Sequence, residues 1–305
     1  MEQPLSRKPG NSDTVDYSTK KHVRKEKGKR TENMDYKALS KPFEHLLENI
    51  EAENGQAFID LFCDGKISVN VPRYGQIGNN IVFCRYLRQV KLWLSEREGV
   101  RFEFWRALQD DTHLVMHMMI FFEINDAEFN YHKELHIPIG ILCEMENGKI
   151  KTARVYYTTY WAAGGHNITR PAMLNEDPKL METLPESEKT YFRCLWEADS
   201  KTILNELFDK DASFMSTAYS IYHGEDLIKV FDSMFSGGRN TELRLCTAFM
   251  AEGSLVVEYM NHRSGGNPNT PSAGMAIYTY TPEGKVSYVR LAGDSSYDHC
   301  LWPTL

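Results

Sequence analysis

The sequence of 305 residues lacks several features that would assign it to a definite class. It has no run of 18 apolar residues, which a membrane-spanning helix needs, and no apolar stretch near its start of the kind that marks a secretion signal. The six cysteines are widely spaced, without a CxxC pair or zinc-ligand spacing. Phosphate-binding Gly loops, nucleophile elbows, EF-hands and HExxH are missing too. We therefore expect a cytoplasmic protein with reduced cysteines, no cofactor and no metal.

Positive charge exceeds negative charge only near the N-terminus. The formal net charge is −7, yet residues 1–33 carry nine Lys and Arg against five Asp and Glu. The remainder is therefore acidic, which argues against a nucleic-acid-binding surface on the folded part. Large apolar side chains are rare in residues 1–33, so we expect a disordered basic tail. Its run Lys20–Arg30 is either a targeting or anionic-surface segment or a solvated tail, and we favour the last.

The chain length favours two domains rather than one. Residues 163–183 have a linker composition, with Gly164, Gly165, Pro171 and Pro178. We therefore place one domain at 34–162 and a second at 184–305.

Both halves are predicted to repeat one order of elements. In the first half, we expect helices at 40–53 and 56–62, a strand at 67–71, a third helix from 80, and strands at 100–108, 113–124, 133–144 and 149–157. In the second half, we expect helices at 186–197, before 208 and at 227–235, and strands at 212–217, 241–249, 254–262, 273–281 and 286–291.

Short matches align the two halves. Ala57–Phe62 corresponds to Ile203–Phe208, and Arg154 corresponds to Arg290 after the hairpin turns Gly148-Lys149-Ile150 and Gly284-Lys285-Val286. The predicted fold class is α+β, with two cone-shaped domains. In each, three N-terminal helices pack on a strongly bent antiparallel sheet and enclose a pocket.

These elements resemble the nuclear transport factor 2-like superfamily, and within it the SnoaL-like branch of polyketide cyclases and dehydratases. The resemblance covers roughly residues 36–161 and 184–302. It implies a cofactor-free acid–base enzyme acting on a hydrophobic small molecule, of the dehydratase, isomerase or cyclase type, as in specialised metabolism. Because the superfamily also includes transport and assembly domains, a noncatalytic ligand-binding or assembly module is the alternative.

The catalytic positions of the superfamily can be compared with this sequence one by one. Where ketosteroid isomerases have their two carboxylates, the first half has Asn70 or Val71 and Gly140, so that site is absent. The second half has Ser216 and Ala276 there, and neither is a carboxylate. Many SnoaL-like sequences end the last strand with an Asp, and Asp294 matches this position as a candidate catalytic residue or a loop cap.

The first half has a histidine-rich sheet. By strand alternation, His117 shares a side with Met119 and Phe121, and Glu134 shares a side with His136. Resemblance to scytalone-type dehydratases makes His117 and His136 candidate catalytic groups, with Glu134 tuning one of them. The competing interpretation places them on the outer sheet face or at a domain contact. A metal site that includes His132 would need further ligands.

Two more candidates come from the ends of strands. Tyr157 lies in an aromatic cluster that either lines a pocket mouth or seals a domain interface. Glu258 lies among apolar residues, and if buried it would be a candidate acid or base; the alternative, which is commoner, is a solvent-facing glutamate.

The strand His113–Ile124 has large apolar residues on both sides, which predicts burial on both faces. Helices cover only one face of a sheet, so we expect the other half of the chain to cover the second. This arrangement would be an intrachain pseudo-dimer and a monomer in solution.

Overall fold

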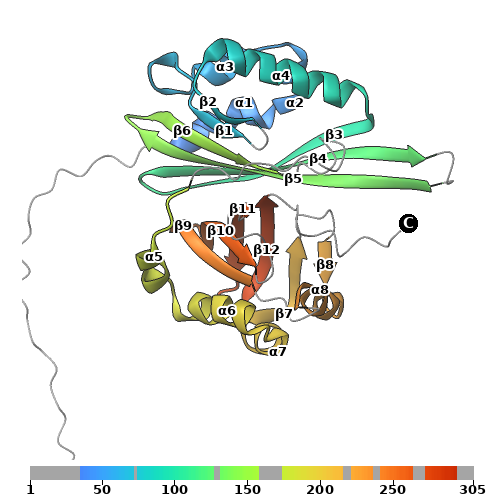
Figure 1. The fold of residues 1–305 in the computed structure, drawn as a ribbon, viewed down its shortest axis with the longest axis vertical. Coiled ribbons are helices and arrows are strands. Elements are labelled where there is room, and N and C mark those ends of the chain that lie inside the picture. Colours follow the sequence, from blue (N-terminus) through green and yellow to red (C-terminus); the bar gives the residue numbers. More distant parts are fainter. Residues whose placement is uncertain are drawn as a thin grey trace, which may run out of the picture. The chain divides into compact units, whose positions relative to one another are not determined.

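The protein is described by a computed structural model covering residues 35–71, 74–126, 131–157, 174–215, 221–235, 241–263 and 272–293. It is an α+β protein with two six-stranded sheets, each with its own helices (Figure 1). Residues 34–305 form one compact unit. The expected disordered tail lies outside the described residues.

The first half begins with the 3-10 helix η1 (Tyr36–Ser40). Helices α1 (Lys41–Glu44), α2 (Leu46–Glu51), α3 (Gly55–Ile59) and η2 (Cys63–Gly65) follow. The short strands β1 (Val69–Val71) and β2 (Gly75–Ile77) precede the long helix α4 (Asn80–Ser95). The sheet is completed by β3 (Glu98–Gln109), β4 (His113–Asp126), β5 (Tyr131–Glu146) and β6 (Lys149–Tyr156).

The second half repeats this order with α5 (Pro178–Thr183), α6 (Glu186–Glu197), α7 (Ser200–Thr202) and the π-helical turn η3 (Ile203–Leu207). Strands β7 (Phe208–Met215) and β8 (Ile221–His223) lead into α8 (Asp226–Phe235). The remaining strands are β9 (Thr241–Ala251), β10 (Ser254–Arg263), β11 (Ser272–Tyr280) and β12 (Val286–Gly293). Helix α5 lies within the segment that we predicted to be a linker.

Asparagine side chains fix the helix starts around the first core. The Asn54 side chain accepts a hydrogen bond from the Ala57 amide at the start of α3, and Asn79 accepts from Ile81 and Val82 at the start of α4. The helix predicted over 40–53 is divided, because His45 leaves helical geometry at φ −109°, ψ 38°.

The two sheets have the orders β2-β1-β6-β5-β4-β3 and β8-β7-β12-β11-β10-β9. They are mixed sheets, whereas we predicted antiparallel ones. The difference is that β1 pairs in parallel with β6, and β7 pairs in parallel with β12. The first strand of each half returns beside the last, and the sequence pattern does not reveal this long-range pairing.

Strand alternation divides each sheet into two apolar faces. Along β4, Met116, Met118 and Ile120 pack beneath the helices of the first half. Their neighbours Val115 and Met119 point to the opposite face. This confirms the expectation that β4 is buried on both sides.

The outer faces of the two sheets pack against each other. Leu108, Val115, Leu142 and Tyr156 of the first half form one buried apolar cluster with seven residues of the second half. These seven are Ala251, Val256, Met260, Ala273, Met275, Ile277 and Ala292. The halves are thus paired through their sheets, as expected for an intrachain pseudo-dimer.

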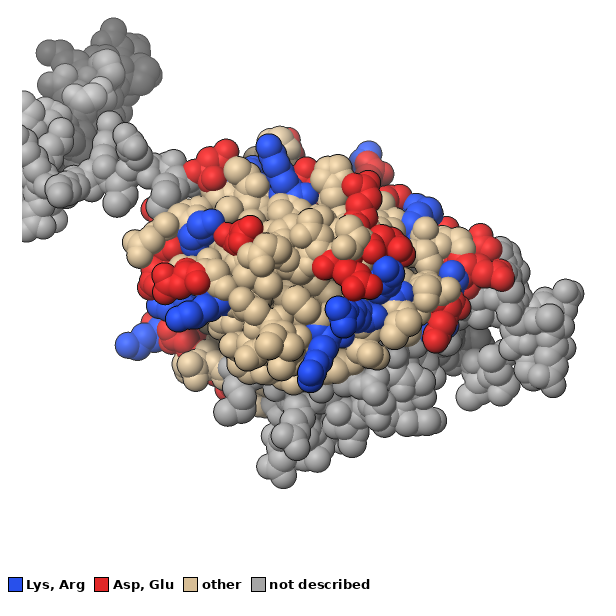
Figure 2. All heavy atoms as spheres, turned by 90° about the horizontal axis from the view of Figure 1, so that it is seen from above, with Lys and Arg blue, Asp and Glu red and all other residues tan. Residues whose placement is uncertain are grey.

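The helix-covered face of the first half carries charges of both signs (Figure 2). Lys and Arg lie among Asp and Glu around an uncharged centre, so this face has no field of one sign. Within the described residues, no helix combines the length and the apolarity that crossing a membrane requires.

Gly140 marks the closest approach of the two sheets. A Cβ atom added there would overlap the Met275 side chain and lie 3.1 Å from the Ala292 Cβ. We predict that Gly140→Val lowers the free energy of unfolding by about 2 kcal/mol, because an overpacked core must shift. Gly78→Ala, where an added Cβ meets nothing within 4 Å, is the control. Urea unfolding of both variants checks this, and equal stability of the two would contradict it.

Candidate functional site

A cavity of about 110 Å³ lies between the helices and the sheet of the first half. Its walls come from α1–α4 and from the helix-facing residues of β1, β4, β5 and β6. The lining residues are Phe43, Leu46, Ile50, Phe58, Phe62, Val69, Val71, Phe83, Tyr86, Leu87, Val90, Met118, Ile120, Ile139, Ile141, Ala153, Val155 and Tyr157. Sixteen of these eighteen side chains are apolar, and the two tyrosines supply the only side-chain hydroxyls.

Helix and strand periodicity together produce this lining. Phe83, Leu87 and Val90 recur at helical spacing on α4, so all three point at the sheet. Ala153 and Val155 on β6, and Tyr157 directly after it, follow the period of two and share the helix-facing side.

Tyr86 and Tyr157 form a hydrogen-bonded tyrosine pair at the cavity wall. Burial, and then the neighbouring Tyr157, raise the pKa of Tyr86 well above its usual value. Its hydroxyl therefore stays protonated at neutral pH and serves as a hydrogen-bond donor. The Tyr74 ring packs edge-on against Tyr86, with centroids 5.3 Å apart. Because Tyr74 is half exposed, the tyrosine pair lies at the solvent side of the cavity wall.

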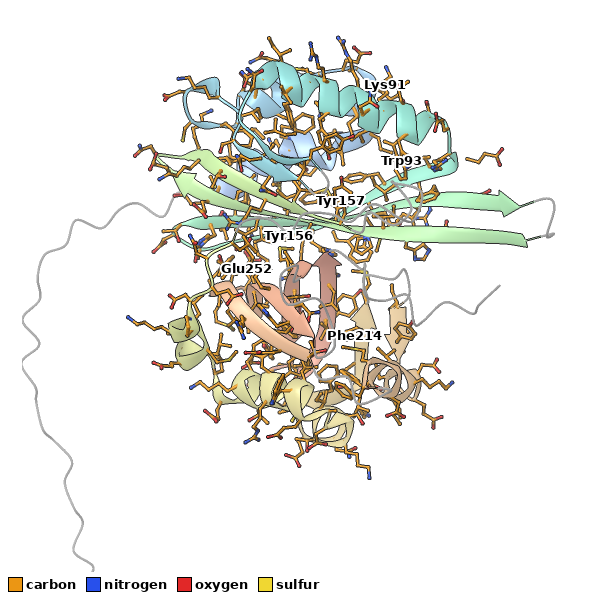
Figure 3. The ribbon with its side chains drawn as sticks, in the orientation of Figure 1. Lys91, Trp93, Tyr156, Tyr157, Phe214 and Glu252 are labelled. Atoms are coloured by element: carbon orange, nitrogen blue, oxygen red, sulfur yellow. The ribbon has the colours of Figure 1, made fainter. Side chains whose placement is uncertain are left out.

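Tyr157 is the one predicted site residue that the structure places at this cavity. Adjacent residues on a strand face opposite ways, so Tyr156 points away from the cavity (Figure 3). Of the two roles considered for this aromatic cluster, lining a pocket or sealing an interface, each is filled by one of the two neighbouring tyrosines. Tyr157 lines the cavity and Tyr156 seals the contact between sheets.

His117 lies on the opposite face of the first sheet, fully buried between the two halves. Its ring centroid is 5.3 Å from that of Trp105, and neither ring nitrogen has a hydrogen-bond partner among the described residues. Burial, and then the charges of Arg290 and Arg106, lower the pKa of His117 to about 3. It is therefore a neutral residue of the contact between sheets, outside the cavity.

Glu134 and His136 lie on the same outer face, nearer to solvent. His136 Nε2 lies 2.9 Å from Glu134 Oε1, and the Arg101 guanidinium holds the same carboxylate at 3.1–3.2 Å. Slight burial works in the other direction, but hydrogen bonds from His136 and Arg101 lower the pKa of Glu134. Glu134 and His136 interact as expected, but the structure does not bring either of them to His117 or to the cavity.

Glu258 is buried, although a solvent-facing position is commoner for a glutamate on a strand, and its partners include residues of the first half. Its carboxylate accepts hydrogen bonds from Arg154 Nε and Nη2, from the Tyr156 hydroxyl and from Thr247 Oγ1. Burial alone would lower the pKa of Arg154, but the Glu258 carboxylate raises it overall. Arg154 also reaches Glu144 at 2.6 Å. Glu258 is therefore fully hydrogen-bonded and lies away from the cavity.

Aromatic rings pack together in the core of the second half. Tyr191 packs on Phe208 and Tyr278, and Phe231 packs on Phe208 and Phe214. A buried carboxylate that the sequence analysis missed, Glu188 on α6, accepts a hydrogen bond from Ser187 Oγ at 2.6 Å.

Asp294 lies outside the described residues. Within the described part of the chain, no three His, Cys, Asp or Glu side chains come together as a metal site. Sequence reasoning also missed Tyr86, although its helical spacing with Phe83 and Val90 places it on the core face of α4. Two partners of Glu258, Arg154 and Tyr156, had no sequence signal, because they come from the other half of the chain.

No family model matches the sequence, and no curated protein matches it. Among solved structures, a putative polyketide cyclase from Sinorhizobium meliloti is 15% identical and has a TM-score of 0.31 over 36% of this chain and 97% of its own. An epoxide hydrolase/cyclase-like enzyme with a role in salinomycin pyran-ring formation is 22% identical, with a TM-score of 0.30 over 38% of this chain and 92% of its own. An NTF2-like protein of unknown function from Cytophaga hutchinsonii is 13% identical, with a TM-score of 0.28 over 42% of this chain and 95% of its own. Each of these matches spans only part of this chain.

The neutral state of His117 makes stability depend on pH. In the unfolded chain, His117 has a pKa of about 6.5 and takes up a proton below that pH. In the folded chain its pKa is about 3, so it stays neutral until the pH is much lower. Stability from this group is therefore complete above pH 6.5 and falls as the pH drops toward 3, by about 2 kcal/mol at pH 5. His117→Gln does not titrate and should show a smaller loss between pH 7 and pH 5. Urea unfolding at both pH values measures the difference, and identical losses would rule out a buried neutral His117.

The pair Arg154–Glu258 supports the sheet contact. We predict that Glu258→Gln lowers the free energy of unfolding by about 3 kcal/mol, because Arg154 remains buried with half of its carboxylate contacts removed. The control is Glu146→Gln, which breaks an exposed ion pair with Lys151 and should cost less than about 1 kcal/mol. Thermal and urea unfolding compare the two, and a loss for Glu258→Gln no larger than the control would be the contrary result.

Proposed function

We propose that the first half of the protein binds an uncharged, largely apolar small molecule in its cavity, where the tyrosine pair orients the ligand. The observation that carries this proposal is the cavity lining, in which Tyr86 and Tyr157 supply the only side-chain hydroxyls. A few polar groups in an apolar pocket are typical of small-molecule sites.

The lining restricts the charge of the ligand. No side chain at the cavity is ionised at neutral pH, and burying an unpaired ion there would be costly. The high pKa of Tyr86 keeps a proton available for donation. A neutral ligand with one oxygen acceptor, such as a ketone, ether or alcohol, therefore fits better than an acid or an amine.

The volume restricts the size of the ligand. An engineered apolar protein cavity of about 150 Å³ holds benzene, so 110 Å³ suits a small ring or a short branched chain. A larger ligand requires the helices of the first half to move away from the sheet. The short helices α1–α3 are the elements best suited to such movement, because few residues anchor each one.

An acid–base enzyme of the dehydratase, isomerase or cyclase type is the second candidate. Tyr157 favours it, since a protonated phenol beside Tyr86 polarises a ligand carbonyl or epoxide oxygen by donating a hydrogen bond. Among the described residues that line the cavity there is no carboxylate or imidazole, so they include no base for proton abstraction. Ligand binding without turnover is therefore the function we place first, in a cytoplasmic monomer formed by the two paired halves.

Substitution of the tyrosine pair tests this function. NMR titrations with toluene and cyclohexanone give the ratio of their dissociation constants. In Tyr86→Phe/Tyr157→Phe, we expect that ratio to shift about 3- to 10-fold against cyclohexanone, because one hydrogen bond to the ligand oxygen is lost. Tyr222→Phe, in the second half, is the control and should leave the ratio unchanged.

Ala153→Leu fills part of the cavity and should weaken the binding of both probes. Binding that is unaffected by Ala153→Leu would place the ligand elsewhere and overturn the proposal. Mass spectrometry of the incubated cyclohexanone and of a small cyclic epoxide separates the two candidate functions. A product that disappears in Tyr157→Phe would favour the enzyme.

A further inference from the structure

The contact between the two sheets contains two corresponding half-sites, and strand register identifies which residues correspond. Arg154 and Arg290 each lie five residues beyond the lysine of the final hairpin turn. Two residues after each of these arginines lie Tyr156 and Ala292. From each of them, strand pairing defines a row of residues that lie side by side across the sheet. The first row is Tyr156, Gly140, His117 and Arg106. The second row is Ala292, Met275, Glu258 and Thr247. His117 therefore occupies in the first sheet the position that Glu258 occupies in the second.

The first half-site consists of Arg154 and the groups around it, and its charges are compensated. Arg154 contacts two carboxylates, Glu258 from the opposite sheet and Glu144 from its own. Tyr156 and Thr247 complete the hydrogen bonds of Glu258. One buried cation is thus held by two anions.

The second half-site consists of Arg290 and the corresponding groups. It has an additional cation, and neutral residues where the first half-site has carboxylates. His117 replaces the first carboxylate, and register places Thr279 where Glu144 would stand. Arg106 takes the place of Thr247 and donates to Thr279 and Ser254 at 3.2 Å. Among the described residues, no carboxylate pairs with Arg106 or Arg290.

Several polar atoms of this half-site lack partners. Both ring nitrogens of His117 and the Nε and Nη1 atoms of Arg290 are buried without a hydrogen bond within the described part of the chain. The Arg290 guanidinium lies 4.4 Å from the Trp105 ring centroid, and Trp105 also packs on His117. Aromatic contact supports a cation but does not replace an acceptor for its N–H groups.

We propose that the second half-site binds a small anion with carboxylate-like oxygen acceptors, between Arg290, Arg106 and His117. The first half-site shows the chemistry that is missing, since there a carboxylate is held by the corresponding arginine. Two partly buried cations beside a buried, neutral histidine favour a single negative charge, and His117 has a ring N–H to donate to it. Because the unpaired nitrogens are closed to solvent, the anion enters when the sheets open locally or associate during folding.

Anion-dependent stability at pH 8, where His117 is neutral, tests this proposal. The full chain is melted in sodium gluconate, whose anion is bulky, with increasing replacement by sodium acetate, chloride or phosphate at constant ionic strength. We expect at least one small anion at 100 mM to raise Tm by about 3 °C or more, because binding only to the folded state is stabilising. Comparison of acetate and phosphate distinguishes a carboxylate ligand from an inorganic one.

Two variants locate the effect. His117→Glu places the carboxylate of the first half-site in the second, so Tm in gluconate should rise and the response to acetate should vanish. Arg290→Gln should also remove the response, whether or not it lowers Tm. Arg101→Gln removes an exposed arginine of the same sheet face and should keep the full response.

The wild-type protein alone is enough to refute the site. A Tm that is the same in all four anions would show that the half-site binds none of them, and the proposal would fail. A response that persists in Arg290→Gln would place the anion elsewhere, with the same consequence. Loss of cavity binding in the Ala153→Leu experiment has no bearing on this result, because the two sites lie on opposite faces of the first sheet.

Discussion

The packing of two sheet faces against each other is the constraint on which the rest of this structure depends. Each half has helices on only one face of its sheet, and both sheets are apolar on the other face as well. Neither half is covered without its partner. Burial of these faces removes apolar area from water, and the Arg154–Glu258 ion pair joins the two halves across the contact. Pairing is therefore part of folding rather than a later assembly step.

The contact also decides which polar residues are available for chemistry. His117 and Glu258 stand out in the sequence because charged or titratable residues are uncommon in apolar strands. In the structure, both face the other half, and neither faces the cavity. Residues that stabilise a buried contact and residues that catalyse proton transfer share one sequence pattern, a polar side chain among apolar neighbours. The cavity described above lies in the first half, and aromatic rings pack together in the core of the second.

The sequence predicted most elements of the fold, because helix and strand periods are local properties. The extent of β4 and the α6 helix follow from the spacing of their own residues, and the repeat of elements follows from comparing the halves. The parallel pairing of β1 with β6 could not be predicted, since about 80 residues separate the strands and no local pattern records the pairing. For the candidate site, strand alternation correctly placed His117 on the same side of its strand as Met119 and Phe121. It could not say which face carries the cavity and which meets the other half, so Tyr157 alone of the candidates reached the cavity.

Tyr156 and Tyr157 are consecutive residues with different roles. The first holds a carboxylate of the opposite half, and the second forms part of the cavity wall. Neighbouring residues of an extended strand face opposite ways, so the backbone cannot turn at one of them without turning the other. Selection for a different ligand at Tyr157 is therefore coupled to the strength of domain pairing through Tyr156. Divergence of the cavity is easiest at lining positions on the helices, which can vary while the last residues of β6 stay fixed.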